Sequence, residues 1–136
     1  MKELIIMVGP QGSGKTTYSK KRFPNYLRIS SDEQGRNHKQ IFNNAIKDKV
    51  EKIIVDKTNP TKKIRKRFID SGKSQGYIIT IIWLDILSSV CKERILKRTN
   101  HETLLPEKAD EALNHYFSRF EPPKRDDCDM LIRIIK

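Results

Sequence analysis

One glycine-rich segment near the start of the chain constrains its fold more than any other feature. Residues 9–16 read Gly-Pro-Gln-Gly-Ser-Gly-Lys-Thr and match the pattern G-x-x-x-x-G-K-[ST] in full. The apolar run over residues 4–8 predicts a buried strand before this loop, and the residues after it can continue as a helix. Glycines let successive backbone N–H groups point at phosphate oxygens, and the helix start adds partial positive charge. The pattern therefore predicts a loop that holds the phosphates of a nucleotide.

The last residues of this loop have distinct expected roles. Lys15 is expected to reach the β- and γ-phosphates, which makes it a candidate catalytic residue as well. Thr16 is expected to offer its hydroxyl to Mg²⁺, which bridges the same phosphates. The sequence thus predicts that ATP, as the donor substrate, and Mg²⁺ bind here. The expected nucleotide contacts are Gly9, Gly12, Ser13, Gly14, Lys15, Thr16 and Thr17.

Short runs rich in β-branched residues alternate with helical segments along the rest of the chain. Strands are predicted over residues 4–8, 26–29, 52–55 and 77–84, and a weaker candidate over 130–135 could close the sheet at one edge. Strands that alternate with helices favour a parallel sheet covered by helices on both faces. We therefore predict one α/β domain over residues 1–136. Its expected architecture is a three-layer P-loop NTPase fold with a mostly parallel sheet of about five strands flanked by helices.

Two of the helices can be placed from their residue patterns. Asn59 is predicted to cap a helix with Pro60 at its first position, and Ile64 and Phe68 share one face of that helix. The segment 107–120 is the clearest helix, because apolar and aromatic side chains recur there at helical spacing. These aromatic side chains are expected to pack in the core rather than to stack on bases.

Two aspartates directly follow predicted strands. Asp32 comes after the second strand and Asp56 after the third. Because the carboxyl ends of neighbouring parallel strands lie at the same edge of a sheet, both carboxylates are expected near the phosphate-binding loop. One of them could take a proton from an acceptor hydroxyl while the other supports Mg²⁺ or the acceptor. A turn or helix-capping role is the alternative for each aspartate.

A pair of arginines marks a further candidate element. Arg94 and Arg98 are four residues apart, and this spacing places both guanidinium groups on one helix face. The polar segment 99–102 follows them, so this part of the chain is a candidate lid that closes over ATP and stabilises charge on the transferred group. A basic helix face exposed to solvent is the alternative.

The chain is strongly basic, which favours polyanionic partners. It has 28 Lys and Arg residues against 17 Asp and Glu residues, a formal net charge of +11. Five of the cations fall within residues 62–67, next to the predicted acceptor side of the site. Backbone phosphates bound there would release counterions, so we expect a nucleic-acid acceptor whose affinity falls steeply with salt. A basic helix face exposed to solvent is the alternative. The candidate nucleic-acid contacts are Arg36, Asn59, Lys62, Lys63, Arg65 and Lys66.

Taken together, these residues resemble a known family, the P-loop polynucleotide 5′-hydroxyl kinases of phage and of eukaryotic DNA repair. The resemblance extends over nearly the whole chain. The segments that carry it are residues 9–16, Ser31-Asp32, Asp56-Lys57-Thr58-Asn59-Pro60, Arg94 with Arg98, and Phe120-Glu121-Pro122-Pro123. It implies an ATP- and Mg²⁺-dependent enzyme that transfers the γ-phosphoryl group to a 5′-hydroxyl end of DNA or RNA.

The resemblance also implies roles for single residues. Asp32 aligns with the general base for the 5′-hydroxyl, which leaves Asp56 beside Thr16 on the metal side. Arg98 aligns with a lid arginine that contacts the ATP phosphates, and Arg94 is the second lid arginine. Phage members place an arginine three residues after the base, where it contacts the acceptor's phosphate. This chain has a glycine there, at position 35, so either the adjacent Arg36 makes that contact with shifted geometry or acceptor recognition differs.

Two other functions stay open from the sequence. One is a related P-loop kinase for another hydroxyl, on a hydroxymethylated base in DNA or on a small molecule, and the other is a nucleotide-gated nucleic-acid-binding module without transfer activity. Cys91 and Cys128 fit neither a disulfide framework nor a metal-ligand spacing, which favours a reducing, intracellular location. The longest near-apolar run, residues 78–84, is too short to span a membrane, so no membrane partner is expected.

Overall fold

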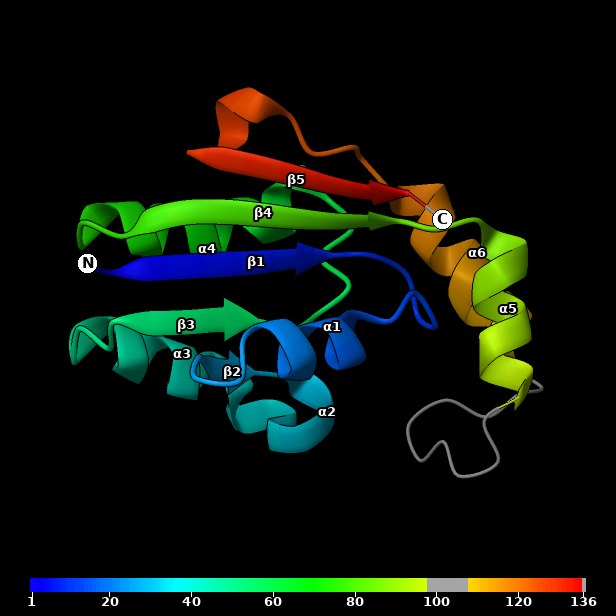
Figure 1. Ribbon diagram of the computed structural model, residues 1–136, viewed down its shortest axis with the longest axis horizontal. Helices are drawn as coiled ribbons and strands as arrows, with labels where there is room; N and C mark the ends of the chain where they lie inside the picture. The colour runs from blue at the N-terminus through cyan, green and yellow to red at the C-terminus, as the bar shows by residue number, and fades with distance from the viewer. Residues whose placement is uncertain (98–107, 136) are drawn as a thin grey trace.

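A five-stranded parallel sheet forms the centre of the computed structural model, which describes residues 1–97 and 108–135 (Figure 1). The strands are β1 (Glu3–Val8), β2 (Leu27–Ile29), β3 (Lys52–Val55), β4 (Ile78–Asp85) and β5 (Met130–Ile135). Their order across the sheet is β2-β3-β1-β4-β5, and every neighbouring pair is parallel. The predicted α/β class is confirmed, and each strand lies within one residue of its predicted bounds.

The strand β1 lies in the middle of the sheet because its side chains are apolar on both faces. Leu4 and Ile6 belong to the core cluster on one face, whereas Ile5 and Met7 belong to the cluster on the other. None of these four side chains is more than 4% exposed. Such a continuous apolar run is typical of a parallel strand covered on both sides. The loop that follows β1 therefore starts from the centre of the core.

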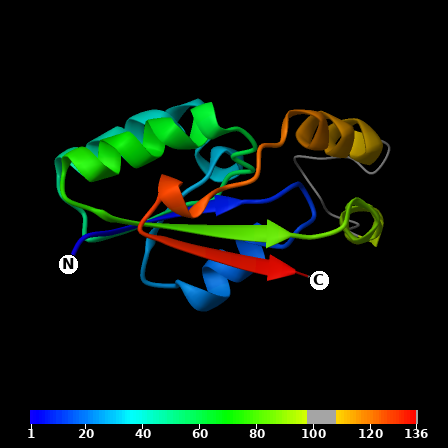
Figure 2. The same ribbon diagram turned by 90° about the horizontal axis from the view of Figure 1, so that it is seen from above.

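Helices cover both faces of this sheet, as the view in Figure 2 shows. The helices are α1 (Lys15–Arg22), α2 (Ser31–Gln34), η1 (Gly35–Asn37), α3 (His38–Lys47), α4 (Lys62–Ser74), α5 (Ser88–Lys97), α6 (Ala109–Arg119) and η3 (Arg125–Asp127). Helices α3 and α4 pack on one face and α1 packs on the other, while α5 and α6 contact each other beyond the carboxyl ends of β1 and β4. In the part of the chain described, no helix is long and apolar enough to cross a membrane.

The start of α4 differs from the prediction. Thr61, not Asn59, is the N-cap residue, and Thr61 Oγ1 accepts a hydrogen bond from the backbone N–H of Ile64 at 3.1 Å. Asn59 has a φ angle of 44°, and its side-chain Nδ2 donates to the carbonyl oxygen of Met7 at 2.7 Å. Because the Asn59 side chain is used to hold the end of β1, it is not available to cap a helix.

The predicted aromatic helix is present as α6, two residues later at its start and one residue shorter at its end. Tyr116 is 3% exposed and stacks on Phe120, with ring centroids 5.3 Å apart. Phe120 in turn contacts Trp83 of β4, with centroids 5.5 Å apart. The prediction of core packing is therefore confirmed for Tyr116. It is wrong for Phe117, which lies on the outward side of the helix and is 40% exposed.

Candidate active site

The phosphate-binding loop runs from the end of β1 to the start of α1. Gly12 and Gly14 have φ angles of 79° and 95°, in the left-handed region that residues with a side chain rarely adopt. A Cβ atom on Gly12 would also lie 2.6 Å from the carbonyl oxygen of Cys91 in α5. Among the described residues, a Cβ atom on Gly14 would meet only Arg94 Nη1, at 3.7 Å. The loop is therefore supported by α5 at Gly12 and open at Gly14.

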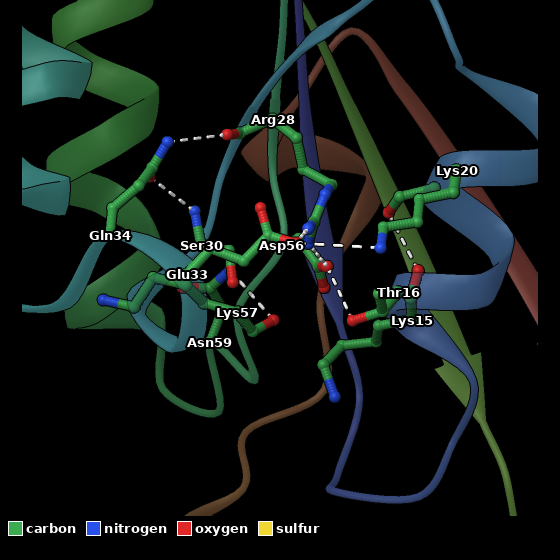
Figure 3. Close-up of polar contacts among 11 residues, drawn as sticks. Lys15, Thr16, Lys20, Arg28, Ser30, Glu33, Gln34, Asp56, Lys57 and Asn59 are labelled. Carbon is green, nitrogen blue, oxygen red and sulfur yellow. Dashed lines mark hydrogen bonds and ion pairs between the residues drawn. The ribbon is translucent and has the colours of Figure 1, made fainter. Parts of the chain in front are cut away.

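Lys15 and Thr16 begin α1 at the carboxyl edge of the sheet. Lys15 Nζ donates a hydrogen bond across the loop to the carbonyl oxygen of Pro10 at 2.8 Å. Thr16 Oγ1 donates to Asp56 Oδ2 at 2.9 Å (Figure 3). Asp56 follows β3, the neighbour of β1, and is only 5% exposed. The strand order thus places the two residues expected on the metal side next to each other.

The chemistry of this pair suits a magnesium-nucleotide complex. A hydroxyl and a carboxylate are hard oxygen donors, the kind that Mg²⁺ prefers, and Mg²⁺ is usually held by one or two such groups together with substrate phosphates. Thr16 and Asp56 lie at the end of the loop whose amides would hold those phosphates. When bound, Mg²⁺ would neutralise negative charge on the phosphates. The residues present therefore fit the predicted cation.

Arg28 is part of this site, and sequence reasoning missed it. Its Nη1 donates to Asp56 Oδ2 at 2.6 Å, the same oxygen that Thr16 contacts, and its Nη2 forms an ion pair with Glu33. The Arg28 side chain is 12% exposed and that of Asp56 is 2% exposed. The available signal was a charged residue inside a run predicted as a buried strand, since charged side chains are buried almost only when they are paired.

A cavity of about 760 Å³ opens beside the loop. Ser13, Gly14 and Thr17 line it from the loop and α1. Four cationic side chains of α1 and α5 line this cavity: Lys21, Arg22, Arg94 and Lys97. No carboxylate is among the described residues that line it. Its apolar lining comes from Leu84, Ile86 and Ile134. Positive charge next to the loop together with an apolar wall suits a ligand with a phosphate tail and a flat base.

Of the two predicted lid arginines, the structure describes one. Arg94, in α5, lies directly against the phosphate-binding loop, and its Nη1 donates to the carbonyl oxygen of Ser13 at 3.1 Å. Its guanidinium group is therefore within the region where phosphates would bind. Arg98 and the segment 99–102 lie outside the described residues.

Asp32, the expected base, lies in the first turn of α2, directly after β2 and at the same edge of the sheet as the loop. Its side chain is exposed, and within the described residues it forms no hydrogen bond or ion pair. The neighbouring Gln34 fixes α2 to the sheet, because its Nε2 donates to the carbonyl oxygen of Arg28 at 3.0 Å and its Oε1 accepts from the N–H of Ser30 at 2.9 Å. The Asp32 carboxylate is thus accessible on a helix that is held in place.

The expected nucleic-acid contacts divide into two groups. Lys62, Lys63 and Lys66 are exposed on α4, and Arg36 is exposed in η1. Asn59 and Arg65 are only 1% exposed. The prediction that either side chain contacts a phosphate backbone is therefore wrong.

The burial of Arg65 has a clear structural cause. Its Nη1 donates to the carbonyl oxygen of Asn59 at 2.9 Å, and its Nη2 donates to that of Glu121 at 2.7 Å. Arg65 thus joins the start of α4 to the segment that follows α6. The sequence carried a signal for this position, because Arg65 is three residues before the buried Phe68 and so lies near the inward face of the helix.

Replacing Arg65 with methionine is expected to lower the free energy of unfolding by about 3 kcal/mol, because two buried carbonyl oxygens lose their donors. Urea unfolding followed by circular dichroism measures this change. The matched control is Lys66→Met on the exposed face of α4, expected to change the free energy by no more than about 0.5 kcal/mol. Equal effects of the two substitutions would show that Arg65 has no special structural role.

Lys57 and His38 form a second contact that was not predicted. Lys57 Nζ lies 3.0 Å from His38 Nε2, and His38 Nδ1 lies 2.7 Å from the carbonyl oxygen of Gly35. Because an ammonium group can only donate, Nε2 accepts this hydrogen bond, and Nδ1 carries the hydrogen that it donates to the carbonyl oxygen of Gly35. Burial, together with the nearby charges of Lys39 and Arg67, lowers the pKa of Lys57. This contact ties the start of α3, and through the Gly35 carbonyl also η1, to the residue after Asp56.

Comparison with known proteins identifies the family of this chain. A model of the AAA domain family matches residues 4–49 and 35–123. These matches cover well over half of the chain, so the protein belongs to the AAA domain family. Its parallel sheet and phosphate-binding loop give it the fold of the solved P-loop kinases described next.

One curated relative and several solved structures are similar to the chain. The bifunctional polynucleotide phosphatase/kinase of Schizosaccharomyces pombe is 30% identical over 126 residues, which are 89% of this chain and 30% of that protein. The chain therefore spans less than a third of this relative's length. A gluconokinase from Sinorhizobium meliloti is 17% identical, with a TM-score of 0.66 over 98% of this chain and 82% of that chain. The APS kinase of Mycobacterium tuberculosis, in complex with AMPPNP and APS, is 14% identical, with a TM-score of 0.65 over 97% and 88%. At such identities, the solved structures confirm the fold.

Proposed function

We propose that this protein is an ATP- and Mg²⁺-dependent kinase that transfers the γ-phosphoryl group to the 5′-hydroxyl end of DNA or RNA. The observation that carries the donor half of this proposal is the 2.9 Å contact between Thr16 and Asp56 at the end of the phosphate-binding loop. The acceptor half is supported by the 30% identity to a polynucleotide phosphatase/kinase and by the exposed cations of α4.

Each group of the site has a task in this reaction. The loop amides and Lys15 hold the triphosphate, and Thr16 and Asp56 hold Mg²⁺ against it. Asp32 accepts the proton of the 5′-hydroxyl, whose oxygen forms the new bond to the γ-phosphorus. The bond between that phosphorus and the oxygen that bridges it to the β-phosphate breaks, so the products are ADP and a 5′-phosphate end. Arg94 stabilises charge on the phosphates from the side of α5.

The acceptor end of the nucleic acid is proposed to lie along the exposed side of α4. Lys62, Lys63 and Lys66 project from the first two turns of this helix, which follows the segment after Asp56. Contacts of lysines with backbone phosphates position a strand without reading its sequence. We therefore expect little preference for base sequence and a strong dependence on salt.

Replacing Lys63 and Lys66 with glutamine is expected to weaken oligonucleotide binding and to reduce the slope of log affinity against log salt by about 2, one for each lost phosphate contact. Fluorescence anisotropy of a labelled 5′-hydroxyl oligonucleotide at several salt concentrations measures both quantities. The control pair is Lys47→Gln with Lys49→Gln, which removes the same charge at the opposite edge of the sheet. If the control pair lowers the slope equally, the effect comes from net charge and not from α4.

The proposed reaction is tested by ATP turnover with two oligonucleotides that differ only at the 5′ end. A 5′-hydroxyl strand is expected to stimulate formation of ADP, whereas the same strand with a 5′-phosphate is expected not to. Equal stimulation by both strands would indicate a different acceptor hydroxyl. Binding of both strands without turnover would indicate a nucleotide-gated binding module.

A further inference from the structure

We propose that Arg28 is a positioning residue that couples the magnesium side of the site to α2, the helix that carries Asp32. The inference rests on the proposed function and goes beyond it, because it concerns communication between the donor and acceptor sides. Cation binding next to Asp56 is inferred to weaken the hold of Asp56 on Arg28, and Arg28 in turn weakens cation binding.

Arg28 is the central member of a series of polar contacts that begins and ends on α1 (Figure 3). Thr16 of α1 contacts Asp56 at 2.9 Å, Asp56 contacts Arg28 of β2 at 2.6 Å, and Arg28 pairs with Glu33 of α2. Glu33 completes the series with an ion pair to Lys20 of α1 at 3.7 Å. Glu33 is the residue directly after Asp32. One arginine therefore joins the carboxylate of the metal side to the helix of the acceptor side.

Burial makes the contact between Arg28 and Asp56 the dominant one. Asp56 has a side-chain exposure of 2% and Arg28 of 12%, whereas Glu33 is 54% exposed. Charges interact more strongly when water is excluded from around them. A divalent cation held by Thr16 and Asp56 would share the carboxylate charge that now holds Arg28. The two positive charges therefore compete for one carboxylate, and this competition acts equally in both directions.

Helix α2 depends on such contacts for its position. It has only four residues, too few for a stable helix without tertiary support. The contacts of Gln34 hold its end to β2, and the pair of Arg28 with Glu33 holds its middle. A change in the direction of the Arg28 side chain would thus be transmitted to the turn that contains Asp32.

The substitution Arg28→Gln is expected to change two properties in opposite directions. The Mg²⁺ concentration that gives half-maximal binding of a non-hydrolysable ATP analogue should fall about tenfold, within the usual range for coupled sites. At saturating Mg²⁺, the KM for a 5′-hydroxyl oligonucleotide should rise, because α2 has lost a tether. Calorimetry at stepped Mg²⁺ concentrations measures the first property and steady-state kinetics the second. If Arg28 had only a structural role, the substitution Arg28→Gln would not tighten cation binding.

Two further variants keep the proposal testable if Arg28→Gln does not fold. Glu33→Gln cuts only the contact to α2, so it should raise the oligonucleotide KM without lowering the Mg²⁺ midpoint. Arg28→Lys retains a positive charge but lacks the two-armed guanidinium group. It should leave the midpoint near that of the unmodified protein and raise the KM.

Arg125→Gln, at an exposed position of η3, is the control for the loss of one positive charge and should change neither quantity. An unchanged or higher Mg²⁺ midpoint in Arg28→Gln would overturn the proposal, as would an equal shift in Arg125→Gln or an unchanged KM in Glu33→Gln. If analogue binding by the unmodified protein did not respond to Mg²⁺, the proposed function would fail as well. If the unmodified protein responds normally to Mg²⁺, such results overturn only the role proposed for Arg28.

Discussion

Asparagine in place of Asp32 is expected to reduce phosphoryl transfer by at least about 10²–10⁴-fold, the usual contribution of a general base. Asparagine has nearly the shape of aspartate but cannot take the proton of the acceptor hydroxyl at neutral pH. Asp32 is exposed and makes no hydrogen bond or ion pair with another described residue, so its loss should leave the fold and nucleotide binding unchanged. The rate in single-turnover experiments and the affinity for the ATP analogue measure the two effects separately.

The control for this experiment is Asp48→Asn, which makes the same chemical change at an exposed position after α3. It should leave the rate unchanged. Near-full activity of Asp32→Asn would move the base role elsewhere, with Asp56 as the first alternative. Parallel loss of ATP-analogue binding would instead indicate that Asp32 supports the donor side.

Alanine in place of Lys15 is expected to weaken binding of the ATP analogue by about 10- to 100-fold, because a hydrogen bond from a charged group to the phosphates is lost. Transfer should fall by about a further 10²–10³-fold, since the same charge is needed most when the γ-phosphoryl group is between its two oxygens. Calorimetry with the analogue and single-turnover kinetics give these quantities. Lys73→Ala, at an exposed position near the end of α4, is the control. Tight binding and normal turnover in Lys15→Ala would contradict the role assigned to the phosphate-binding loop.

The parts of the site that follow from local sequence could be predicted. The loop pattern predicted the place of Lys15 and Thr16 in the site, because its glycines, lysine and threonine each meet a different requirement of phosphate and Mg²⁺ binding. The approach of Thr16 to Asp56 could also be anticipated, since an aspartate after a parallel strand lies at the same edge of the sheet as the loop. Both inferences need only the order of strands and loops along the chain.

The parts that depend on contacts between distant segments could not be predicted. Arg28 pairs with Asp56, 28 residues further along the chain, and no local pattern indicates this partner. Arg65 was counted with the other cations of its segment, yet its guanidinium group is used to join two backbone carbonyls on different elements. Asn59 follows the rule for a helix cap, but the end of β1 uses its side chain instead. In each case a tertiary contact overrides a local preference.

The most direct test of the proposed chemistry uses one oligonucleotide that carries a 5′-hydroxyl, a 3′-hydroxyl and a hydroxymethylated base. After incubation with ATP and Mg²⁺, fragmentation by tandem mass spectrometry locates any added phosphate. We expect a single phosphate on the 5′ oxygen, and none when Asp32→Asn replaces the unmodified protein. A phosphate on the base or at the 3′ end, or an unmodified strand, would contradict the proposal that this protein is a 5′-hydroxyl kinase.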